Sequence, residues 1–271
     1  MDSKEQLTFF AWTDTHFGYR PQFAGNDHRW NTLQQMTQLP GWPYSPEIGG
    51  YVDSPEFIMH CGDLVDAEAN GEEALSYYLY CMKQTNLPSF ETLGNHDLAH
   101  PNVIDYFVQK HGGKYYSFDR KGVHFVFLYQ TFTKEEKVKA LDKVQLQWLK
   151  QDLSEVGPDK PVVLFSHDRL DNLPNANGVD SVLAKAKVIL MLSGHNHSGT
   201  PAYTWNGRTG MVIGHCRAHP SDAILGRRIV VVKITERELI VVPWRWDLQQ
   251  WARHQGWKEE AGEHVVKRLP L

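Results

Sequence analysis

The stretch LTFFAWTDTH, residues 7–16, sets a pattern that recurs along the chain: an apolar run with strand character leads directly into polar side chains. The five runs and their polar ends are Leu7 to Thr13 before Asp14 and His16, Phe57 to Cys61 before Asp63, Ser89 to Leu93 before Asn95, Val162 to Ser166 before His167, and Val188 to Ser193 before His195 and His197. In an open sheet with helical crossovers, the loops leaving the C-terminal strand ends meet at one edge. We therefore expect these polar side chains to converge.

The residue types at these strand ends indicate metal binding. Side chains two apart on an extended segment share a face, so Asp14 and His16 can share a metal ion, and the same reasoning applies to His195 and His197. Oxygen and imidazole ligands without thiolate suit Mn, Fe, Zn or Co better than a structural cysteine-bound zinc. Two divalent ions beside two carboxylates and a hydroxide leave a positive site, which would attract a phosphate anion.

The order D-x-H, G-D, G-N-H-D, H, G-H-x-H resembles the calcineurin-like metallophosphoesterases, from residue 7 to about residue 243. Asp14 to Phe17 and Gly94 to Asp97 are similar to the branch that contains class III cyclic-nucleotide and glycerophosphodiester phosphodiesterases. Each short motif alone is weak, whereas all five in order, each after a strand, form a specific pattern. The resemblance implies an α/β fold, a four-layer αββα sandwich of two mixed sheets flanked by helices.

The resemblance also implies a role for each residue. Asp14, His16 and His197 would bind the first metal ion, Asn95, His167 and His195 the second, and Asp63 would bridge them. His96 would donate a proton to the leaving group, and Asp66 matches the position that orients this histidine in the Ser/Thr phosphatase branch. Neighbouring side chains on an extended chain point apart, so Asn95 and His96 suit one metal ligand and one substrate contact.

Further polar residues are candidates for substrate binding. His215 and Arg217 follow the apolar run at 210–214, which places them near the same edge. Arginine suits bidentate contact with phosphate, so Arg217 or His215 would touch the substrate phosphate or else support the metal ligands. Arg20 and Arg29 are further candidates in the long segment 17–55.

The other histidines are expected to have structural or surface roles. His60 and His124 fall inside strand runs and are predicted as core or edge residues. The histidines predicted as solvated side chains are His100, His111, His254 and His264.

Length and composition predict one enzyme domain over residues 1–271. Residues 17–55 form a longer connection than the fold needs, rich in aromatic side chains and with one helix expected near 28–39. This segment is a candidate lid over the site. The alternative is that its tryptophans pack on the sandwich. The tail 244–271 holds four tryptophans, which are expected to pack on the core, with a subunit contact as the alternative. Helices are also predicted at 72–86, 101–111 and 143–153, and hairpins at 115–129 and 202–214.

Charge and composition narrow the partners. The net charge is -4, and the sequence has no Lys/Arg run. Both features argue against a nucleic-acid partner. Three cysteines without paired spacing favour a reducing compartment. The polar start of the chain predicts a cytoplasmic protein, unless a signal peptide was removed, and no apolar stretch reaches the roughly 18 residues of a membrane span. The sequence leaves the oligomeric state open.

The expected function is metal-dependent hydrolysis of a small phosphate ester. The resemblance favours a phosphodiester, such as a cyclic nucleotide or a glycerophosphodiester. A phosphomonoesterase acting on nucleotides or phosphosugars is the alternative. A third hypothesis is a non-catalytic scaffold, because the retromer subunit of this fold serves as a binding platform; the presence of His96 and of all the ligands argues against it.

Overall fold

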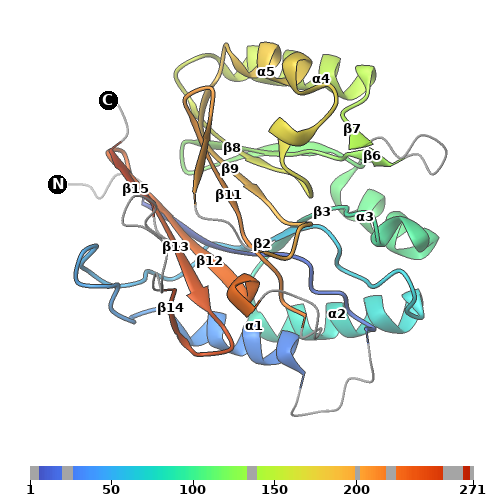
Figure 1. Ribbon diagram of the computed structural model, residues 1–271, viewed down its shortest axis with the longest axis vertical. Coiled ribbons are helices and arrows are strands. Elements are labelled where there is room, and N and C mark those ends of the chain that lie inside the picture. The colour runs from blue at the N-terminus through green and yellow to red at the C-terminus, as the bar shows by residue number, and fades with distance from the viewer. Residues whose placement is uncertain are drawn as a thin grey trace.

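Two β-sheets form the centre of the molecule (Figure 1). The computed structural model describes residues 6–19, 27–132, 139–198, 202–217, 224–252 and 265–268. The first sheet has the strand order β14-β13-β12-β1-β2-β3, with β15 paired to β13. Its strands are β1 (Leu7–Trp12), β2 (Ile58–Cys61), β3 (Ser89–Thr92), β12 (Arg228–Ile234), β13 (Glu238–Arg245), β14 (Gln250–Trp251) and β15 (Val265–Arg268).

The second sheet has the order β10-β11-β9-β8-β5-β4. Its strands are β4 (Tyr116–Arg120), β5 (Val123–Phe127), β8 (Pro161–Phe165), β9 (Lys187–Ser193), β10 (Tyr203–Trp205) and β11 (Arg208–Val212). A separate short pair joins β6 (Thr131–Phe132) to β7 (Lys139–Ala140). Both hairpins expected from the sequence are present, as β4–β5 and β10–β11.

Helices cover the outer face of each sheet. Figure 1 shows α1 (His28–Gln38) and α2 (Gly71–Thr85) below the first sheet and α4 (Lys143–Val156) and α5 (Ala176–Leu183) above the second. The third long helix, α3 (Pro101–His111), packs with α2, and short 3-10 turns lie at η1 (Asp97–Ala99), η2 (Leu170–Asn172) and η3 (Ile224–Gly226). The Asn70 side chain caps α2, and Pro101 occupies the first turn of α3, where its missing N–H costs nothing.

Three apolar layers hold these elements together. Between the sheets, Phe9 of β1 packs edge-on against Phe125 of β5 and Phe165 of β8, with centroid distances of 5.7 and 6.0 Å. A second cluster joins the first sheet to α1, α2 and α3, and a third joins the second sheet to α4 and α5. The predicted four-layer αββα sandwich is therefore confirmed.

Parallel pairing brings the strand ends to one edge. In the first sheet β1, β2 and β3 run parallel, and in the second sheet β5, β8 and β9 do so. The metal ligands predicted from the sequence follow the C-terminal ends of β1, β2, β3, β8 and β9, and the end of β5 carries none of them. His215 and Arg217 follow β11, which runs parallel to β9. Both sheets thus deliver side chains to a common region.

The described part of segment 17–55 lies against the first sheet. Its helix α1 buries Leu33 and Met36, and Trp42 contacts Trp244 of β13 edge-on at 5.4 Å between ring centroids. Trp42 nevertheless remains 46% exposed. Trp30 packs against the same apolar cluster. These contacts favour the packing alternative for both tryptophans, and the lid itself stays a prediction.

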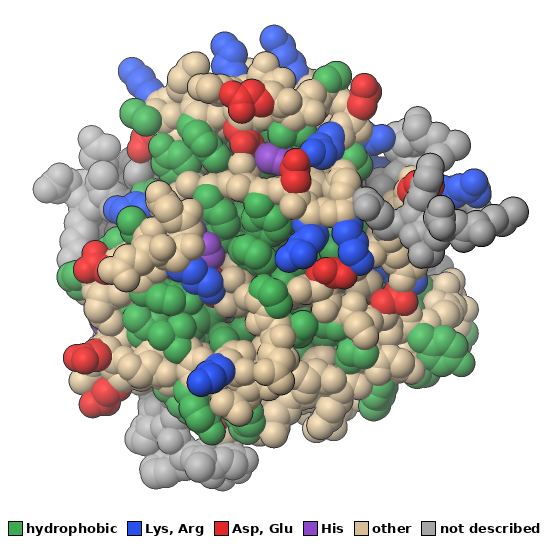
Figure 2. Space-filling view, turned by 180° about the vertical axis from the view of Figure 1, so that it is seen from behind, with side chains coloured by type: hydrophobic (Ala, Val, Ile, Leu, Met, Phe, Trp, Pro, Cys, Tyr) green, Lys and Arg blue, Asp and Glu red, His purple; other side chains and the backbone are tan. Residues whose placement is uncertain are grey.

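The described part of the tail also packs on the core, as expected, while Trp257 lies outside the described residues. Trp244 and Trp246 are buried, and the Trp251 indole N–H donates to the Pro43 carbonyl at 2.8 Å. Among the described helices, none combines the length and apolar character that crossing a membrane requires. On the face shown in Figure 2, basic and acidic side chains are interspersed. The predicted cytoplasmic location and absence of nucleic-acid partners stay predictions.

Candidate metal centre

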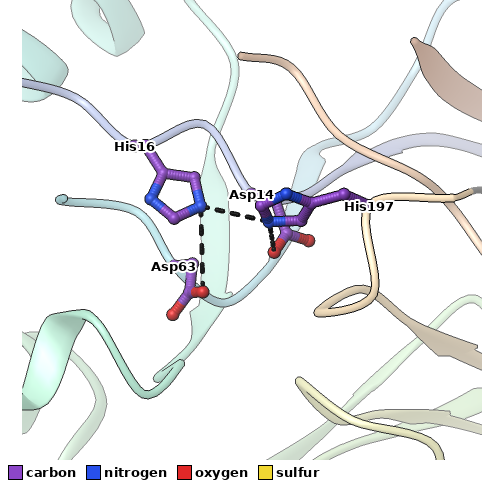
Figure 3. Close-up of side chains that lie close together, drawn as sticks. All are labelled: Asp14, His16, Asp63 and His197. Atoms are coloured by element: carbon purple, nitrogen blue, oxygen red, sulfur yellow. Dashed lines mark hydrogen bonds and ion pairs between the residues drawn. The ribbon is translucent and has the colours of Figure 1, made fainter. Parts of the chain in front are cut away.

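The first cluster of donor atoms combines three strand-end residues of the first sheet with one from the second. Asp14, His16 and Asp63 meet His197, and one ligand atom from each lies within 4.8 Å of the others (Figure 3). His197 Nε2 is 3.0 Å from Asp14 Oδ1 and 3.3 Å from His16 Nε2. Asp63 Oδ2 lies 3.8 Å from His16 Nε2. These four are the predicted ligands of the first metal ion together with the predicted bridge.

The second cluster lies on the other side of Asp63 and consists of Asp63, His167 and His195. Asp63 Oδ2 lies 3.2 Å from His167 Nε2, which lies 3.1 Å from His195 Nδ1. Asp63 is therefore common to both clusters, as a bridging ligand must be. Asn95 follows β3 in the same loop as His96, whose backbone N–H donates to Asp63 Oδ1 at 2.8 Å.

The backbone at these ligands differs from the extended chain that the sequence argument assumed. Asp14, His16, Asp63, His195 and His197 all have positive φ, between 45° and 72°. Left-handed backbone does not alternate faces as a strand does. Asp14 and His16 nonetheless share a cluster, whereas His195 and His197 go to different clusters. The expectation from spacing that these two histidines share one ion is wrong, because His197 and His195 fall in separate donor groups. The division of the ligands between two ions that the family resemblance implies stays a prediction.

Glycines next to the ligands allow the loops to interlock. A Cβ atom at Gly94 would overlap with the Asp63 carboxylate, and one at Gly194 would overlap with that of Asp14. The loop after β1 is tied to the loop after β2 by backbone N–H donation from Asp14 to Gly62 and from His16 to Asp63, at 3.0 and 3.1 Å. Close backbone approach explains the glycines of the G-D, G-N-H-D and G-H-x-H motifs.

The donor atoms suit metal cations on chemical grounds. His16 Nδ1 bonds to Asp66 Oδ2 at 3.0 Å and His167 Nδ1 to the Cys61 carbonyl at 2.8 Å. A neutral imidazole that donates at Nδ1 presents a lone pair at Nε2. Both Nε2 atoms point into the clusters. Asn95 Oδ1 is buried without a hydrogen-bond partner among the described residues, which also fits a metal ligand.

The electrostatics of the centre favour positive charge. Burial alone raises the pKa of Asp63, but the facing His167, His16 and His96 rings lower it well below its usual range. Burial lowers the pKa of His167, yet the Asp63 carboxylate raises it to about 10. Each shift means that the site stabilises a positive charge beside Asp63, which the proton on His167 supplies here. A metal ion would replace that proton and leave His167 neutral as a ligand. A divalent metal ion satisfies the same carboxylate.

His96 lies beside the first cluster and is partly accessible. Its side chain is 31% exposed, and its ring is 4.5 Å from the His16 ring, centroid to centroid. The Ala67 backbone N–H donates to His96 Nδ1 at 3.1 Å, so Nε2 is the atom that can carry a proton. Asp66 Oδ2 lies 3.8 Å from His96 Nδ1 and 3.0 Å from His16 Nδ1. The closer contact of Asp66 is thus to a metal ligand.

The four residues suggested for substrate binding differ in their positions. Arg217 lies at the first cluster, where Nη2 donates to His197 Nδ1 at 3.2 Å and Nη1 is 4.0 Å from Asp66 Oδ2. His215 is fully buried and donates from Nδ1 to the Arg217 carbonyl, which favours the supporting role for it. Arg29 is buried and donates to the His16 carbonyl at 2.6 Å. Arg20 lies outside the described residues.

Sequence reasoning missed a charged pair beside the second cluster. Lys139 Nζ lies 3.1 Å from Asp168 Oδ2 and contacts His195 Nε2. The Asp168 backbone is fixed by Gln130, whose side chain both accepts from its N–H at 2.7 Å and donates to its carbonyl at 2.8 Å. Asp168 directly follows the predicted ligand His167, and this position could have indicated that it lies near the metal centre. Lys139 belongs to no motif.

Two histidines expected to be solvated are not: His100 is buried, and the side chain of His111 is 4% exposed. His111 Nε2 pairs with Glu91 at 2.7 Å, and His100 Nε2 bonds to the Asp66 carbonyl at 2.7 Å. Those two predictions are wrong, because partners distant in sequence supply the polar contacts. His60 and His124 are buried, as expected. His254 and His264 lie outside the described residues.

Comparison with known proteins agrees with this geometry. The profile of the calcineurin-like phosphoesterases matches residues 7–199, and the chain belongs to that family. A dimetal phosphatase from Danio rerio superposes with a TM-score of 0.69 at 15% identity, covering 96% of this chain and 98% of that chain. GAP50 of Plasmodium, described as the anchor in the inner membrane complex, superposes with a TM-score of 0.61 at 14% identity. The match covers 91% of this chain and 87% of that chain. At these identities the likeness concerns the fold. A search of curated proteins gives no match.

The family and the two donor clusters support metal-dependent phosphoester hydrolysis as the class of activity. Divalent metal binding has the same support.

Proposed function

We propose that the protein hydrolyses small phosphate esters at a two-metal centre. The observation that carries this proposal is the pair of donor clusters sharing Asp63, with the partly exposed His96 beside them. Two bound ions of Mn, Fe, Zn or Co would supply an acidified water molecule and neutralise phosphate oxygens. Asp14, His16 and His197 would hold one ion and Asn95, His167 and His195 the other.

The chain's own residues account for the remaining chemistry. The oxygen of water bonds to phosphorus as the bond from phosphorus to the leaving oxygen breaks, and the departing alkoxide needs a proton. His96 Nε2 donates that proton, since its Nδ1 already accepts the Ala67 N–H. No covalent phosphoenzyme is expected, because water attacks phosphorus directly.

The substrate class divides into two candidates. The similarity of Asp14 to Phe17 and Gly94 to Asp97 to the class III branch supports a phosphodiester, such as a cyclic nucleotide or a glycerophosphodiester. One observation favours the alternative, a phosphomonoester of a nucleotide or sugar. Arg217 at the first cluster and Lys139 at the second place a cation on each side of the centre. These cations offset the second negative charge of a monoester.

A substrate screen of the Mn-loaded protein tests the proposal. Bis(p-nitrophenyl) phosphate, p-nitrophenyl phosphate and a panel of cyclic nucleotides are assayed, with Asp63→Ala as the inactive control. Preference for the diesters supports the first candidate, and preference for the monoester supports the second. Metal-loaded protein that turns over none of them contradicts the enzyme proposal and supports the scaffold hypothesis.

A further inference from the structure

Arg29 is buried beneath the loop that carries the first ligands. Its Nη1 donates to the His16 carbonyl at 2.6 Å and to the Thr15 carbonyl at 3.3 Å. The His16 carbonyl also accepts the Tyr19 N–H at 3.0 Å. The guanidinium carbon lies 5.3 Å from the centroid of the Phe17 ring. One side chain therefore contacts three consecutive residues that follow Asp14.

This arginine is itself held rigidly. Asp27 Oδ1 accepts from Arg29 Nε at 2.8 Å and from its backbone N–H at 3.0 Å, as the N-cap of α1. Both side chains are at least nine-tenths buried. A buried ion pair is costly unless hydrogen bonds use its remaining capacity. Here that capacity is directed to the loop carbonyls.

The loop needs such support because its backbone is unfavourable. Asp14 and His16 are left-handed at φ 49° and 45°, a conformation that ordinary residues adopt only where the surroundings impose it. Its N–H groups are fixed by the neighbouring loop at residues 62–64. The carbonyls of Thr15 and His16 point the other way, to Arg29. The two sets of contacts together determine where the His16 and Asp14 side chains lie.

We propose that Arg29, anchored by Asp27, is a positioning residue that sets the metal affinity of the first cluster. The second cluster takes Asn95, His167 and His195 from loops that Arg29 does not contact in the described hydrogen bonds. Its effect is therefore selective for one of the two sites. The inference rests on the proposed function, because both clusters must be metal sites.

Replacement by lysine isolates the geometry from the charge. Lysine is a single point donor without the planar fork, so it cannot bond to Asp27 and the loop carbonyls in the same way. Loss of a residue that orients metal ligands weakens metal affinity about 10- to 100-fold. Arg29→Lys is therefore expected to weaken one of two Mn²⁺ binding events by about that factor and to leave the other unchanged.

A matched control is available at Arg245. That residue is also buried and pairs with an aspartate two positions away, with Nε and Nη2 at 2.8 and 2.7 Å from Asp247. Arg245→Lys should leave both Mn²⁺ affinities at the wild-type values. Thermal melts of both variants check folding, and Asp27→Asn, which keeps an N-cap residue, provides a second test if Arg29→Lys does not fold.

Calorimetric titration of the chelator-treated full chain with Mn²⁺ gives the result. His197→Ala and Asn95→Ala identify the two binding events. Arg29→Lys should lower the Mn²⁺ affinity of the binding event that His197→Ala abolishes. The affinity of the event that Asn95→Ala abolishes should stay unchanged. Equal weakening of both events, or no weakening, overturns the positioning role. A wild-type chain with no Mn²⁺ binding instead refutes the proposed two-metal function, and this inference with it.

Discussion

The two donor clusters share Asp63 but differ in burial and in charge. In the first, Asp14 and His16 are fully buried, and Asp66 supports His16 from behind. In the second, the His195 side chain is 29% exposed, and the ammonium of Lys139 lies beside it. The carboxylates of Asp14, Asp63 and Asp66 lie around the first cluster, with Arg217 beside them. The second cluster has Asp63 as its carboxylate ligand, and Asp168 and Lys139 lie beside His195. We infer that the first cluster binds its ion more tightly and that the second exchanges its ion more readily.

The largest effect is expected where the two clusters meet. Asp63→Ala removes the ligand that they share, so both ions and all turnover should be lost. Elemental analysis of the purified variant measures metal content, with Asp105→Ala, an exposed aspartate on α3, as the control. Two bound metals in Asp63→Ala would show that the clusters are independent and that Asp63 does not bridge them.

His96 lies beside His16 of the first cluster and is expected to act only on the leaving group. A poor leaving group needs protonation and a good one does not. His96→Ala should lose roughly 10²- to 10⁴-fold in rate on an alkyl ester and far less on a p-nitrophenyl ester. Metal content should stay at the wild-type value. Equal rate losses on both esters would assign His96 to substrate binding instead.

The cations beside the clusters allow a finer comparison. Arg217→Met tests the first cluster and Lys139→Met the second, with the exposed Lys150→Met as the control. A hydrogen bond to a charged group contributes about 1.5–3 kcal/mol, so each variant should raise KM for p-nitrophenyl phosphate by about 10- to 100-fold. The increase should be smaller for the diester, which carries less charge. Unchanged KM with reduced metal content would mean that the cations position ligands.

The smallest effect on turnover is expected at Glu91, inside strand β3. Glu91 is fully buried and bonds to His111 at 2.7 Å and to Lys110 at 2.8 Å. Burial raises the pKa of Glu91, but His111 and Lys110 lower it well below its usual range. Glu91→Gln should leave kcat of the folded protein unchanged while lowering the free energy of unfolding by up to about 3–5 kcal/mol. The reason is that His111 and Lys110, whose side chains are 4% and 29% exposed, lose the buried carboxylate that they share.

The pH dependence of that difference has a defined sign. A carboxyl with a lowered folded pKa stabilises the fold above its unfolded pKa of about 4.3, and the contribution is lost as the pH falls toward the folded pKa. Denaturant unfolding at pH 7 and below pH 4 should show the wild-type advantage over Glu91→Gln shrinking in acid. An advantage that is constant with pH would mean that Glu91 acts through packing alone.

The layers of the fold and the convergence of the ligands could both be predicted from the sequence, because both depend on local signals. An apolar run followed by Asp or His is visible within ten residues, and parallel pairing places such ends together. The contacts around the ligands depend on chain segments that are far apart. Lys139 reaches Asp168 across 29 positions and His111 reaches Glu91 across 20, without a shared motif or period. Asp66 has two histidines within 4 Å, and only coordinates reveal that His16 is the closer one.

The division of ligands between the sheets ties metal binding to the folding of the whole chain. Each cluster takes residues from both sheets, so a bound ion crosslinks them at the edge where the strands end. The ligands span residues 14 to 197, and neither cluster is complete until β9 has docked. Metal that binds only the folded state raises the free energy of unfolding by RT ln(1 + [M]/Kd), about 2.7 kcal/mol at one hundred times Kd. A fragment that ends before His167 contains every ligand that the first sheet supplies. It cannot assemble either cluster, because each one also needs a histidine from the second sheet.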